Sequence, residues 1–429
     1  MNCTILSIGD ELVLGQTVDT NSAWISAKLA SVGVAVRAHV TVPDDQPAIE
    51  SAIRDAAAKS RFVIVSGGIG PTEDDLTRQA MSAVMRVPLE ENAVWMTQLE
   101  SFFKARGREM PVINRIQAMI PRGARMIFNT AGTAAGIDAD LTVEGNSARV
   151  FVVPGVPKEM KIMFDRDVFP AVREIGGGAV ILSCTLHTFG LGESTIAEML
   201  GPLMKRDRNP SVGTTVANGI VSLRVNSRFD SMDIAEDAME QTVGECKLAL
   251  GDLIYGANEL TLPQVVGQLL EVDPLARQHR PALATAESCT GGLLGKMLTD
   301  AAGSSNYYRE GFITYANEAK TELLGVPTEL IAAHGAVSEA VALAMAAGAA
   351  KRAGTPYALS ITGIAGPGGG LPDKPVGTVW FGMHVGGAGD KTSTRMFHLA
   401  GDREMIRDRA AKMALTMLRY RLLCKAMPF

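Results

Sequence analysis

Residues 284–292, with the sequence ATAESCTGG, constrain the fold of this chain more than any other segment. Small residues at its start favour a buried strand, and the glycines at its end favour a sharp turn into a helix. A strand–turn–helix of this kind places Ser288 near a helix N-terminus, where unpaired backbone N–H groups favour developing negative charge. The segment therefore predicts a hydroxyl nucleophile at the end of a strand.

A serine nucleophile needs a base, and residues 312–320, FITYANEAK, supply Tyr315 and Lys320. Lysine acts as a base only if burial or a nearby cation lowers its pKa, so we expect Lys320 to be buried beside Ser288. The alternative is that Ser288 only caps a helix and that Lys320 is a solvated surface cation. A second glycine-rich turn at 360–370, SITGIAGPGGG, indicates that the two turns share one crevice.

These motifs, with HGAVSE and KPVGTVWFG, resemble the C-terminal domain of CinA proteins, the nicotinamide mononucleotide (NMN) deamidase family, over roughly residues 260–422. The resemblance implies that Ser288 attacks the carboxamide, that Lys320 is its base, and that Tyr315 and Thr362 complete the catalytic group without any cofactor. It also favours the serine over Cys289 as nucleophile. Backbone amides near Cys289 or Gly363 are candidates for the oxyanion hole.

The substrate phosphate also needs donors, and we expect Arg403 to bind it together with backbone amides at the helix start. The alternative for Arg403 is a salt bridge at the start of its helix. The predicted substrate-binding residues of this part are Gly291, Gly292, Gly363, Gly366 and Arg403.

Strand and helix patterns alternate through the first part of the chain, which predicts a βαβα order and a parallel sheet. Ligands of such sheets bind beyond the carboxyl ends of the strands. The loop that matters most is 66–77, SGGIGPTEDDLT, which is not a Walker loop because no GK[ST] follows it. The predicted elements are strands at 4–8, 34–40 and 62–66 and helices at 20–32 and 47–58.

Glycines in this loop let backbone amides approach a phosphate, and its hydroxyl and carboxylates are oxygen ligands that hard cations prefer. The alternative is a helix start with favourable acidic residues in its first turn. The expected phosphate-binding residues are Gly67, Gly68, Gly70, Thr72 and Thr133, and the expected metal ligands are Asp10, Glu11, Asp74 and Asp75.

Residues 1–170 are similar to the N-terminal domain of CinA proteins, which is related to molybdopterin-binding proteins of the MoaB and MogA type. The motifs are GDELVLG, DTN, GGIGPTEDDLT, NTAGTAAG and VPGVPKEM, with alanines at 134 and 135 where we expect a proline in much of the family. The resemblance implies hydrolysis of ADP-ribose to AMP and ribose 5-phosphate with a divalent metal, Mg or Co. Related proteins bind molybdopterin instead.

Residues 178–256 predict a small α+β domain after a glycine-rich linker at 174–178, and the resemblance to CinA proteins implies that this domain is a KH-type module. Its expected strands are 185–189 and 220–225, and its expected helices are 193–203 and 232–250. KH domains grip single-stranded nucleic acid through a GXXG loop, which is absent here, so we expect no nucleic-acid partner.

The chain of 429 residues is 47% hydrophobic with a net charge of −5, which is typical of a globular protein without a basic nucleic-acid surface. Five scattered cysteines and no export signal predict a reducing cytoplasm. The alanine-rich run at 339–350 is too short for a membrane span, and we expect a packed helix and no membrane partner.

We therefore predict an α/β protein with three domains: a MoaB/MogA-like three-layer domain (1–170), a KH-type α+β domain (178–256) and a C-terminal α/β/α CinA deamidase domain (259–429). Its predicted function is salvage of pyridine nucleotides by a cytoplasmic homodimer that acts on NMN and ADP-ribose. One alternative is a non-enzymatic accessory protein of competence or DNA damage. Another is a molybdopterin-binding N-terminal module.

Overall fold

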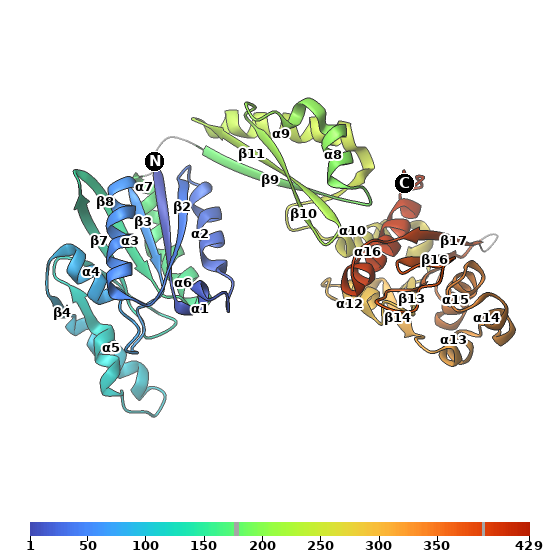
Figure 1. Ribbon diagram of the computed structural model, residues 1–429, viewed down its shortest axis with the longest axis horizontal. Coiled ribbons are helices and arrows are strands. Elements are labelled where there is room, and N and C mark those ends of the chain that lie inside the picture. Colours follow the sequence, from blue (N-terminus) through green and yellow to red (C-terminus); the bar gives the residue numbers. More distant parts are fainter. Residues whose placement is uncertain (176–179, 388–390) are drawn as a thin grey trace. The chain divides into compact units, whose positions relative to one another are not determined.

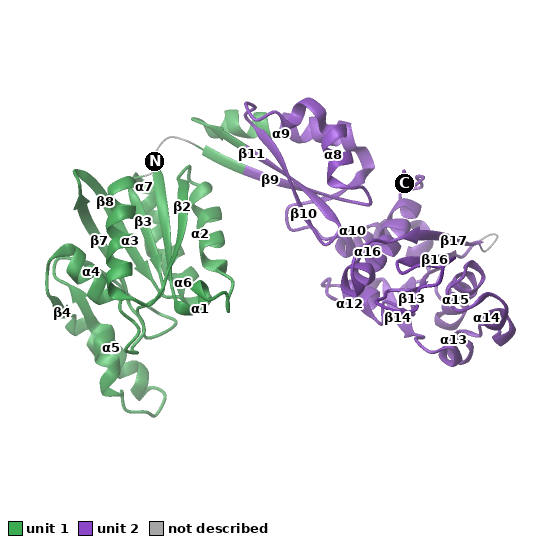
Figure 2. Cartoon of the chain, viewed as in Figure 1, with its two compact units in different colours: residues 1–182, 227–239 green, residues 183–226, 240–429 purple. Residues whose placement is uncertain are grey.

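The computed structural model describes residues 1–175, 180–387 and 391–429. The chain divides into two compact units, which Figure 2 shows in different colours. Unit 1 comprises residues 1–182 and 227–239, and unit 2 comprises residues 183–226 and 240–429.

The core of unit 1 is a six-stranded sheet in the order β2-β1-β3-β8-β7-β6 (Figure 1). The first four of these strands are parallel, whereas β7 and β6 are antiparallel to their neighbours. The parallel arrangement expected for the first three strands is confirmed, and the antiparallel edge was not foreseen. The strands are β1 (Asn2–Ile8), β2 (Ala35–Val42), β3 (Phe62–Ser66), β6 (Arg125–Ile127), β7 (Gly136–Val143) and β8 (Asn146–Val153).

Helices cover both faces of this sheet, so unit 1 has three layers. One core packs Ile49 and Ile53 of α3 and Met81 of α4 against the sheet, and the other packs Ile25 of α2 and Phe164 against the opposite face. The surrounding helices are α1 (Asp10–Val13), α2 (Thr20–Ala30), α3 (Gln46–Lys59), α4 (Thr77–Met85), α5 (Ala93–Lys104), α6 (Pro157–Met163) and α7 (Phe169–Ile175), with a small sheet of β4 (Leu89–Glu91) and β5 (Met119–Pro121).

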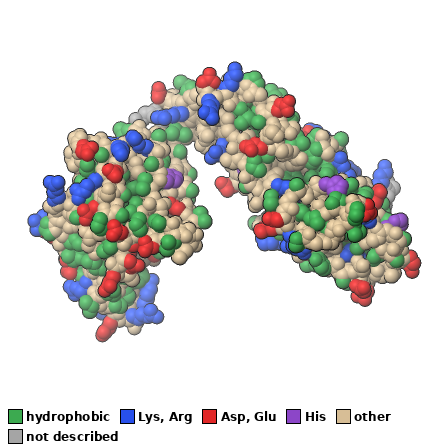
Figure 3. All heavy atoms as spheres, in the orientation of Figure 1, with side chains coloured by type: hydrophobic (Ala, Val, Ile, Leu, Met, Phe, Trp, Pro, Cys, Tyr) green, Lys and Arg blue, Asp and Glu red, His purple; other side chains and the backbone are tan. Residues whose placement is uncertain are grey.

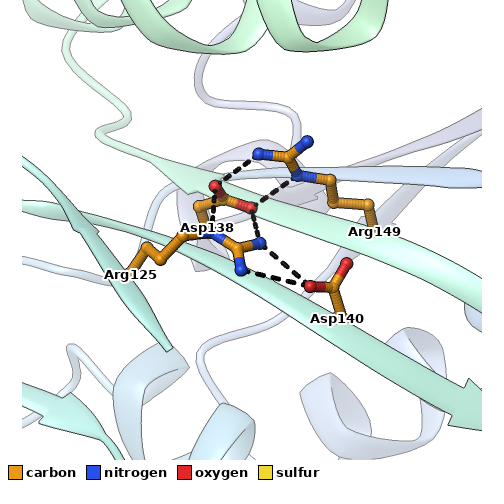
Figure 4. Close-up of polar contacts among 4 residues, drawn as sticks. All are labelled: Arg125, Asp138, Asp140 and Arg149. Atoms are coloured by element: carbon orange, nitrogen blue, oxygen red, sulfur yellow. Dashed lines mark hydrogen bonds and ion pairs between the residues drawn. The ribbon is translucent and has the colours of Figure 1, made fainter. Parts of the chain in front are cut away.

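A cluster of four charged side chains stabilises the antiparallel edge (Figure 4). The Asp138 carboxylate accepts hydrogen bonds from Arg125 Nε at 2.8 Å and from Arg149 Nη2 at 2.8 Å, and Arg125 also reaches Asp140. Burial disfavours ionisation of Asp138, but the hydrogen bonds from the two arginines outweigh it and keep the pKa of Asp138 below its usual value. The cluster joins β6, β7 and β8.

The middle module is a four-stranded sheet in the order β10-β11-β9-β12 with two helices. Its expected helices and strands are present, and β10 and β12 were missed. The expected linker at 174–178 begins within α7, and its residues 176–178 lie outside the described residues. The module consists of β9 (Val180–Phe189), α8 (Glu193–Leu200), β10 (Ser211–Ala217), β11 (Ile220–Phe229), α9 (Met232–Leu250) and β12 (Ile254–Ala257).

The C-terminal part contains a five-stranded sheet in the order β14-β13-β15-β16-β17. Strand β13 pairs in parallel with β14 and β15, and the last two strands are antiparallel. The strands are β13 (Leu283–Glu287), β14 (Tyr308–Ile313), β15 (Tyr357–Gly363), β16 (Thr378–Val385) and β17 (Lys391–His398).

Helices again cover both faces: α10, α12 and α16 pack in one core, and α13, α14 and α15 in the other. The alanine-rich segment lies in α15 and is buried, as expected for a packed helix. The helices are α10 (Leu262–Val272), α11 (Pro274–Gln278), α12 (Leu293–Thr299), α13 (Asn317–Leu324), α14 (Thr328–His334), α15 (Glu339–Ala353) and α16 (Arg403–Leu422).

Helix α16 also contacts the part of the middle module that belongs to unit 2. Arg419 donates to the backbone oxygens of Asp252 and Ile254 at 2.7 and 2.9 Å, and Lys412 Nζ donates to the Asn218 oxygen at 2.9 Å. One helix therefore contacts both modules of unit 2.

Acidic and basic side chains are interspersed over the faces of both units that Figure 3 shows. Across the three described ranges, none of the helices combines the length and the apolar character that crossing a membrane requires.

Candidate active site

Three parallel strands of unit 2 end at the same edge of their sheet. In the register of the sheet, Glu287 at the end of β13 lies opposite Ile313 of β14 and Ile361 of β15. The residues that follow these strand ends therefore meet at one edge, which is where parallel sheets bind ligands. Ser288 and Thr314 are two of these residues.

Ser288 and Lys320 are in direct contact at this edge. Lys320 lies in the first turn of α13, is 1% exposed, and has its Nζ 3.2 Å from Ser288 Oγ. Burial lowers the pKa of Lys320, because the charged ammonium loses its hydration. Its Nζ also donates to the backbone oxygens of Thr314 at 2.9 Å and Tyr315 at 3.2 Å.

The two carbonyls orient the Lys320 amine. A neutral amine has two N–H bonds and one lone pair, and the two carbonyls of Thr314 and Tyr315 accept both N–H bonds. In that neutral form, the lone pair is left to accept from the hydroxyl of Ser288, the third neighbour, at 3.2 Å. The arrangement is suited to removing the hydroxyl proton of Ser288.

The turn after Ser288 is held by Glu287, a role that we did not predict. The buried Glu287 carboxylate accepts hydrogen bonds from the amides of Gly292 at 3.0 Å, Leu294 at 3.0 Å and Gly295 at 2.8 Å. The Gly291 amide donates to the Ser288 oxygen at 3.1 Å. Our expectation that the Gly291 and Gly292 amides bind phosphate is therefore wrong for these atoms, because both already have intramolecular acceptors.

Arg407 in α16 is a second residue that we missed. Its Nε donates to the Cys289 oxygen at 3.1 Å, and its Nη2 donates to the Thr290 oxygen at 2.7 Å. Arg407 is one helical turn after Arg403, so both arginines lie on the same face of the helix. That spacing is the signal from which Arg407 could have been found.

Arg403 joins two other segments of the site. Its Nη1 donates to the Gly366 oxygen at 2.6 Å and its Nη2 to the Tyr315 hydroxyl at 3.2 Å, with the Tyr315 side chain 61% exposed. Within the described residues Arg403 has no ion pair, so the alternative of a helix-start salt bridge is not formed. The partners that the guanidinium has here, the Gly366 carbonyl and the Tyr315 hydroxyl, are both neutral.

Thr362 and Gly363 lie at the end of β15, on the same edge. The buried Thr362 hydroxyl donates to the Ala336 oxygen at 2.8 Å, so Thr362 anchors the segment before α15. Gly363 pairs with Val379 of β16. Neither residue has a hydrogen bond to Ser288 or Lys320 in the part of the chain that the structure describes.

Cys289 is buried, and burial raises the pKa of its thiol to about 12. A thiol attacks as its thiolate, so this environment favours Ser288 over Cys289 as the nucleophile.

Unit 1 has a separate cavity of about 440 Å³ at the carboxyl ends of β1 and β3. Gly68 has a φ of +66°, and a Cβ atom there would lie 2.2 Å from Thr77 Oγ1, so only glycine fits. Asp10 is not among the lining residues. The predicted residues that line the cavity are Glu11, Gly67, Gly68, Gly70, Thr72, Asp74, Asp75 and Thr133.

Asp75 holds the glycine loop of this cavity together. Its carboxylate accepts from the Gly70 amide at 2.6 Å and from the amide and hydroxyl of Thr72 at 2.9 and 2.5 Å. Three of the four lone pairs of this carboxylate are used by the loop, so Asp75 supports the loop and has one lone pair left for the metal that we expected it to bind.

Asp44, which we did not predict, lies beside the other carboxylates and accepts from the Asp10 amide at 2.9 Å. Burial raises the pKa of Asp44, and the negative charges of Asp10, Glu11 and Asp74 raise it further. Oxygen donors of this kind suit a hard cation. Among the described residues, however, no three His, Cys, Asp or Glu side chains are arranged to hold a metal ion, so the predicted ligand set does not fit a metal as it stands.

Three family models match successive parts of the chain. Residues 4–174 match the model described as "probable molybdopterin binding domain", residues 183–256 match the damage-inducible protein CinA KH domain, and residues 269–422 match the CinA C-terminal domain.

Similar proteins match over nearly their whole length. A CinA-like protein of Geobacter sulfurreducens is 42% identical and covers 99% of this chain and 100% of its own. A CinA-like protein of Kosmotoga olearia is 38% identical, with 99% of each chain covered. A crystal structure of a competence-damaged protein (CinA) superfamily member from Escherichia coli is 38% identical over 38% of this chain and 88% of its own, with a TM-score of 0.34.

Proposed function

The chain belongs to the CinA family, and on this premise we propose that its C-terminal domain deamidates NMN with Ser288 as nucleophile and Lys320 as base. One observation carries the proposal: a buried lysine lies 3.2 Å from the serine hydroxyl, with two backbone carbonyls that orient its amine. A lysine that only stabilised the fold would not need a serine hydroxyl beside its amine in addition to the two carbonyls.

In the first step, Ser288 Oγ attacks the carboxamide carbon while its proton passes to the neutral Nζ of Lys320. A C–O bond forms, and the electron pair of the carbonyl π bond moves to the oxygen. When the tetrahedral intermediate collapses, the C–N bond breaks and the Lys320 ammonium returns the proton to the leaving nitrogen. Ammonia departs and an ester remains on Ser288.

In the second step, water attacks the ester carbon and gives one proton to Lys320. The ester C–O bond then breaks, and Ser288 Oγ takes the proton back from Lys320. The product is nicotinic acid mononucleotide. The same lysine therefore serves as base and then as acid in both halves of the reaction, and the chemistry requires no metal or cofactor.

The substrate phosphate is assigned to Arg403 in this proposal. Among the described residues, the partners of the Arg403 guanidinium are the Gly366 oxygen and the Tyr315 hydroxyl, both neutral, so its charge is available to an anion. The exposed Tyr315 side chain lies beside it and can contact the pyridine ring or the ribose.

The direct test is ammonia release from NMN by the purified chain, without added metal, compared with Ser288→Ala. We expect activity in the wild type and its loss in Ser288→Ala, with Ser393→Ala on the exposed face of β17 as a matched control that keeps it. An inactive wild type would remove the deamidase proposal and favour the accessory role in competence or DNA damage. An active Ser288→Ala would remove the serine mechanism.

For unit 1 we propose that the glycine-loop cavity binds ADP-ribose and hydrolyses it to AMP and ribose 5-phosphate. The cavity volume of about 440 Å³ and the Gly68 amide, which has no acceptor among the described residues, support a phosphate-bearing ligand. AMP formation should be measured with and without Mg²⁺ or Co²⁺, and Gly68→Ala should abolish it. Binding without turnover would favour the alternative of a molybdopterin-binding module.

The assembly and location of the protein are further proposals. We propose a cytoplasmic homodimer. We also propose that it has no nucleic-acid partner, because the middle module has Gly190-Leu-Gly192-Glu193 where a KH domain would carry its GXXG loop. Sedimentation of the purified chain, alone and with single-stranded RNA, tests the homodimer and the lack of RNA binding.

A further inference from the structure

The backbone amides of the nucleophile turn are almost all in use. The Ser288 amide donates to the Ile361 oxygen at 2.9 Å, and that of Leu293 to the Thr290 oxygen at 3.3 Å. The amides of Gly291 and Gly292 donate within the turn and to Glu287. Of the amides from 288 to 293, all within the described residues, those of Cys289 and Thr290 are left without a carbonyl or carboxylate acceptor.

The Cys289 and Thr290 amides are therefore the donors of the turn that remain for a substrate, and the Thr290 amide is the one whose peptide plane Arg407 holds. A tetrahedral intermediate on Ser288 carries a negative oxygen within reach of the residues that follow it, and such an oxygen needs preorganised donors.

Arg407 determines which way the Thr290 amide points. In a planar trans peptide, the carbonyl of one residue and the N–H of the next point in opposite directions. Arg407 Nε holds the Cys289 oxygen at 3.1 Å, so the Thr290 N–H points away from Arg407. Arg407 Nη2 holds the following carbonyl, that of Thr290, at 2.7 Å. A single planar guanidinium thus holds two consecutive peptide planes.

The charge of Arg407 matters as well as its geometry. A cationic donor on a carbonyl polarises the whole peptide unit, so the N–H on the other side becomes a stronger donor. A neutral side chain of similar length would orient the plane without this effect, and a lysine would offer one point of contact instead of a planar fork.

We propose that Arg407 is a positioning residue that holds the Cys289–Thr290 peptide so that the Thr290 amide stabilises the oxyanion formed when Ser288 attacks. This inference rests on the proposed function for its substrate. In that step the C–O bond to Ser288 forms and the carbonyl electron pair moves to the oxygen that the Thr290 N–H binds. No atom leaves until the intermediate collapses.

Two arginines one turn apart then have different tasks. Arg403, which contacts Gly366 and the exposed Tyr315, acts on binding, whereas Arg407 acts through the backbone on the transition state alone. An interaction made only in the transition state changes kcat, and one made equally in the ground state changes KM.

The test compares three arginine variants of α16 in the full chain by steady-state ammonia release from NMN. For Arg407→Ala we expect kcat to fall about 10- to 100-fold with KM within about threefold, as for a small misplacement of a catalytic group. For Arg403→Ala we expect mainly a higher KM. Arg409→Ala is the matched control with little change in either, because Arg409 donates to the Ala400 oxygen and not to the turn.

Rescue separates positioning from a general loss of structure. Added guanidinium ion should restore part of kcat to Arg407→Ala and none to Ser288→Ala. If Arg407→Ala does not fold, Arg407→Lys replaces it, with a smaller loss of kcat expected. Unchanged kcat, or a raised KM with unchanged kcat, in the folded variant would overturn the inference.

A second readout does not depend on the substrate. A fluorophosphonate reacts with an activated serine: the Oγ–P bond forms, fluoride leaves, and the serine proton passes to Lys320. We expect labelling of Ser288 in the wild type and slower labelling in Arg407→Ala. If NMN is not hydrolysed but this difference remains, the proposed substrate fails and the role of Arg407 stands; equal labelling rates would overturn that role.

Discussion

The glycine turns of the two units look alike in sequence but differ in what surrounds them. In both, a carboxylate binds the amides of its own turn: Glu287 in unit 2 and Asp75 in unit 1. In unit 2, other segments then bring the buried Lys320 and Arg407 to the turn. In unit 1, the carboxylates of Glu11, Asp44 and Asp74 line the same cavity as the loop, and burial together with the neighbouring negative charges raises the pKa of Asp44.

A glycine-rich turn therefore marks the position of a site but does not show which of its amides are free to bind a ligand. An internal carboxylate can use those amides to build the turn itself. The chemistry is then carried by side chains that reach the turn from elsewhere, such as Lys320 in unit 2.

The largest expected effect on activity comes from replacing Lys320 in unit 2. Lys320→Met keeps the volume of a buried side chain but removes the base, and we expect kcat for NMN to fall by about 10³-fold or more, since Ser288 loses its proton acceptor. Ammonia release and thermal unfolding should be measured together, with Lys296→Met on the exposed face of α12 as the control. If Lys320→Met folds and keeps its activity, Lys320 is not the base. The turn of unit 2 would then not differ from that of unit 1 in having a catalytic lysine.

The pH dependence of kcat/KM gives a second test of Lys320 as the base. The base form of Lys320 is the neutral amine, so kcat/KM should rise about tenfold per pH unit below the Lys320 pKa and level off above it. Because burial lowers that pKa from the usual lysine value of 10.5, the plateau should begin below pH 10.5. A profile that is flat across the range in which the lysine titrates would contradict the assignment of Lys320 as base.

In unit 1 we expect the main effect of an aspartate substitution to be on stability. Asp75→Asn replaces an acceptor of three hydrogen bonds with a group whose NH₂ cannot accept, and should lower the free energy of unfolding of unit 1 by about 1–3 kcal/mol. Asp74→Asn should change it by less than about 0.5 kcal/mol, as an exposed substitution does. Calorimetry of both variants checks this, and equal stabilities would return Asp75 to the candidate metal ligands.

The smallest expected effect comes from replacing Tyr315 at the candidate active site of unit 2. Tyr315→Phe removes the hydroxyl that accepts from Arg403 Nη2 at 3.2 Å, and should raise KM for NMN only a few-fold, since the Gly366 oxygen still holds Arg403. Isothermal titration of NMN to this variant in a Ser288→Ala background gives the affinity directly. A large loss of kcat instead would place Tyr315 among the proton-transfer groups.

The framework of the protein was predictable from the sequence because the signals are local. Alternating strands and helices in residues 1–66 predicted the parallel sheet of unit 1, and the small residues before Ser288 predicted the strand that ends there. The position of Lys320 beside Ser288 was expected on chemical grounds, because a lysine acts as a base only when burial or a nearby cation lowers its pKa.

The remaining features depend on contacts that no local pattern encodes. The acceptors of the Gly291 and Gly292 amides depend on the conformation of one buried side chain, Glu287. Asp44 meets the amide of Asp10 only because β1 and β2 are adjacent, and β6 and β7 pair antiparallel through hairpin contacts that the alternation did not indicate. Arg407 lies in α16, 118 residues after Cys289 in the sequence.

The contact between Arg407 and the nucleophile turn spans 118 residues of chain. A chain is synthesised from its N-terminus, so the turn leaves the ribosome long before the helix that holds its carbonyls has been translated. Unit 1 and the middle module can fold while this last support is still missing. The nucleophile turn is therefore completed only after α16 has been translated, and a nascent chain that stops before α16 carries Ser288 in an unsupported turn.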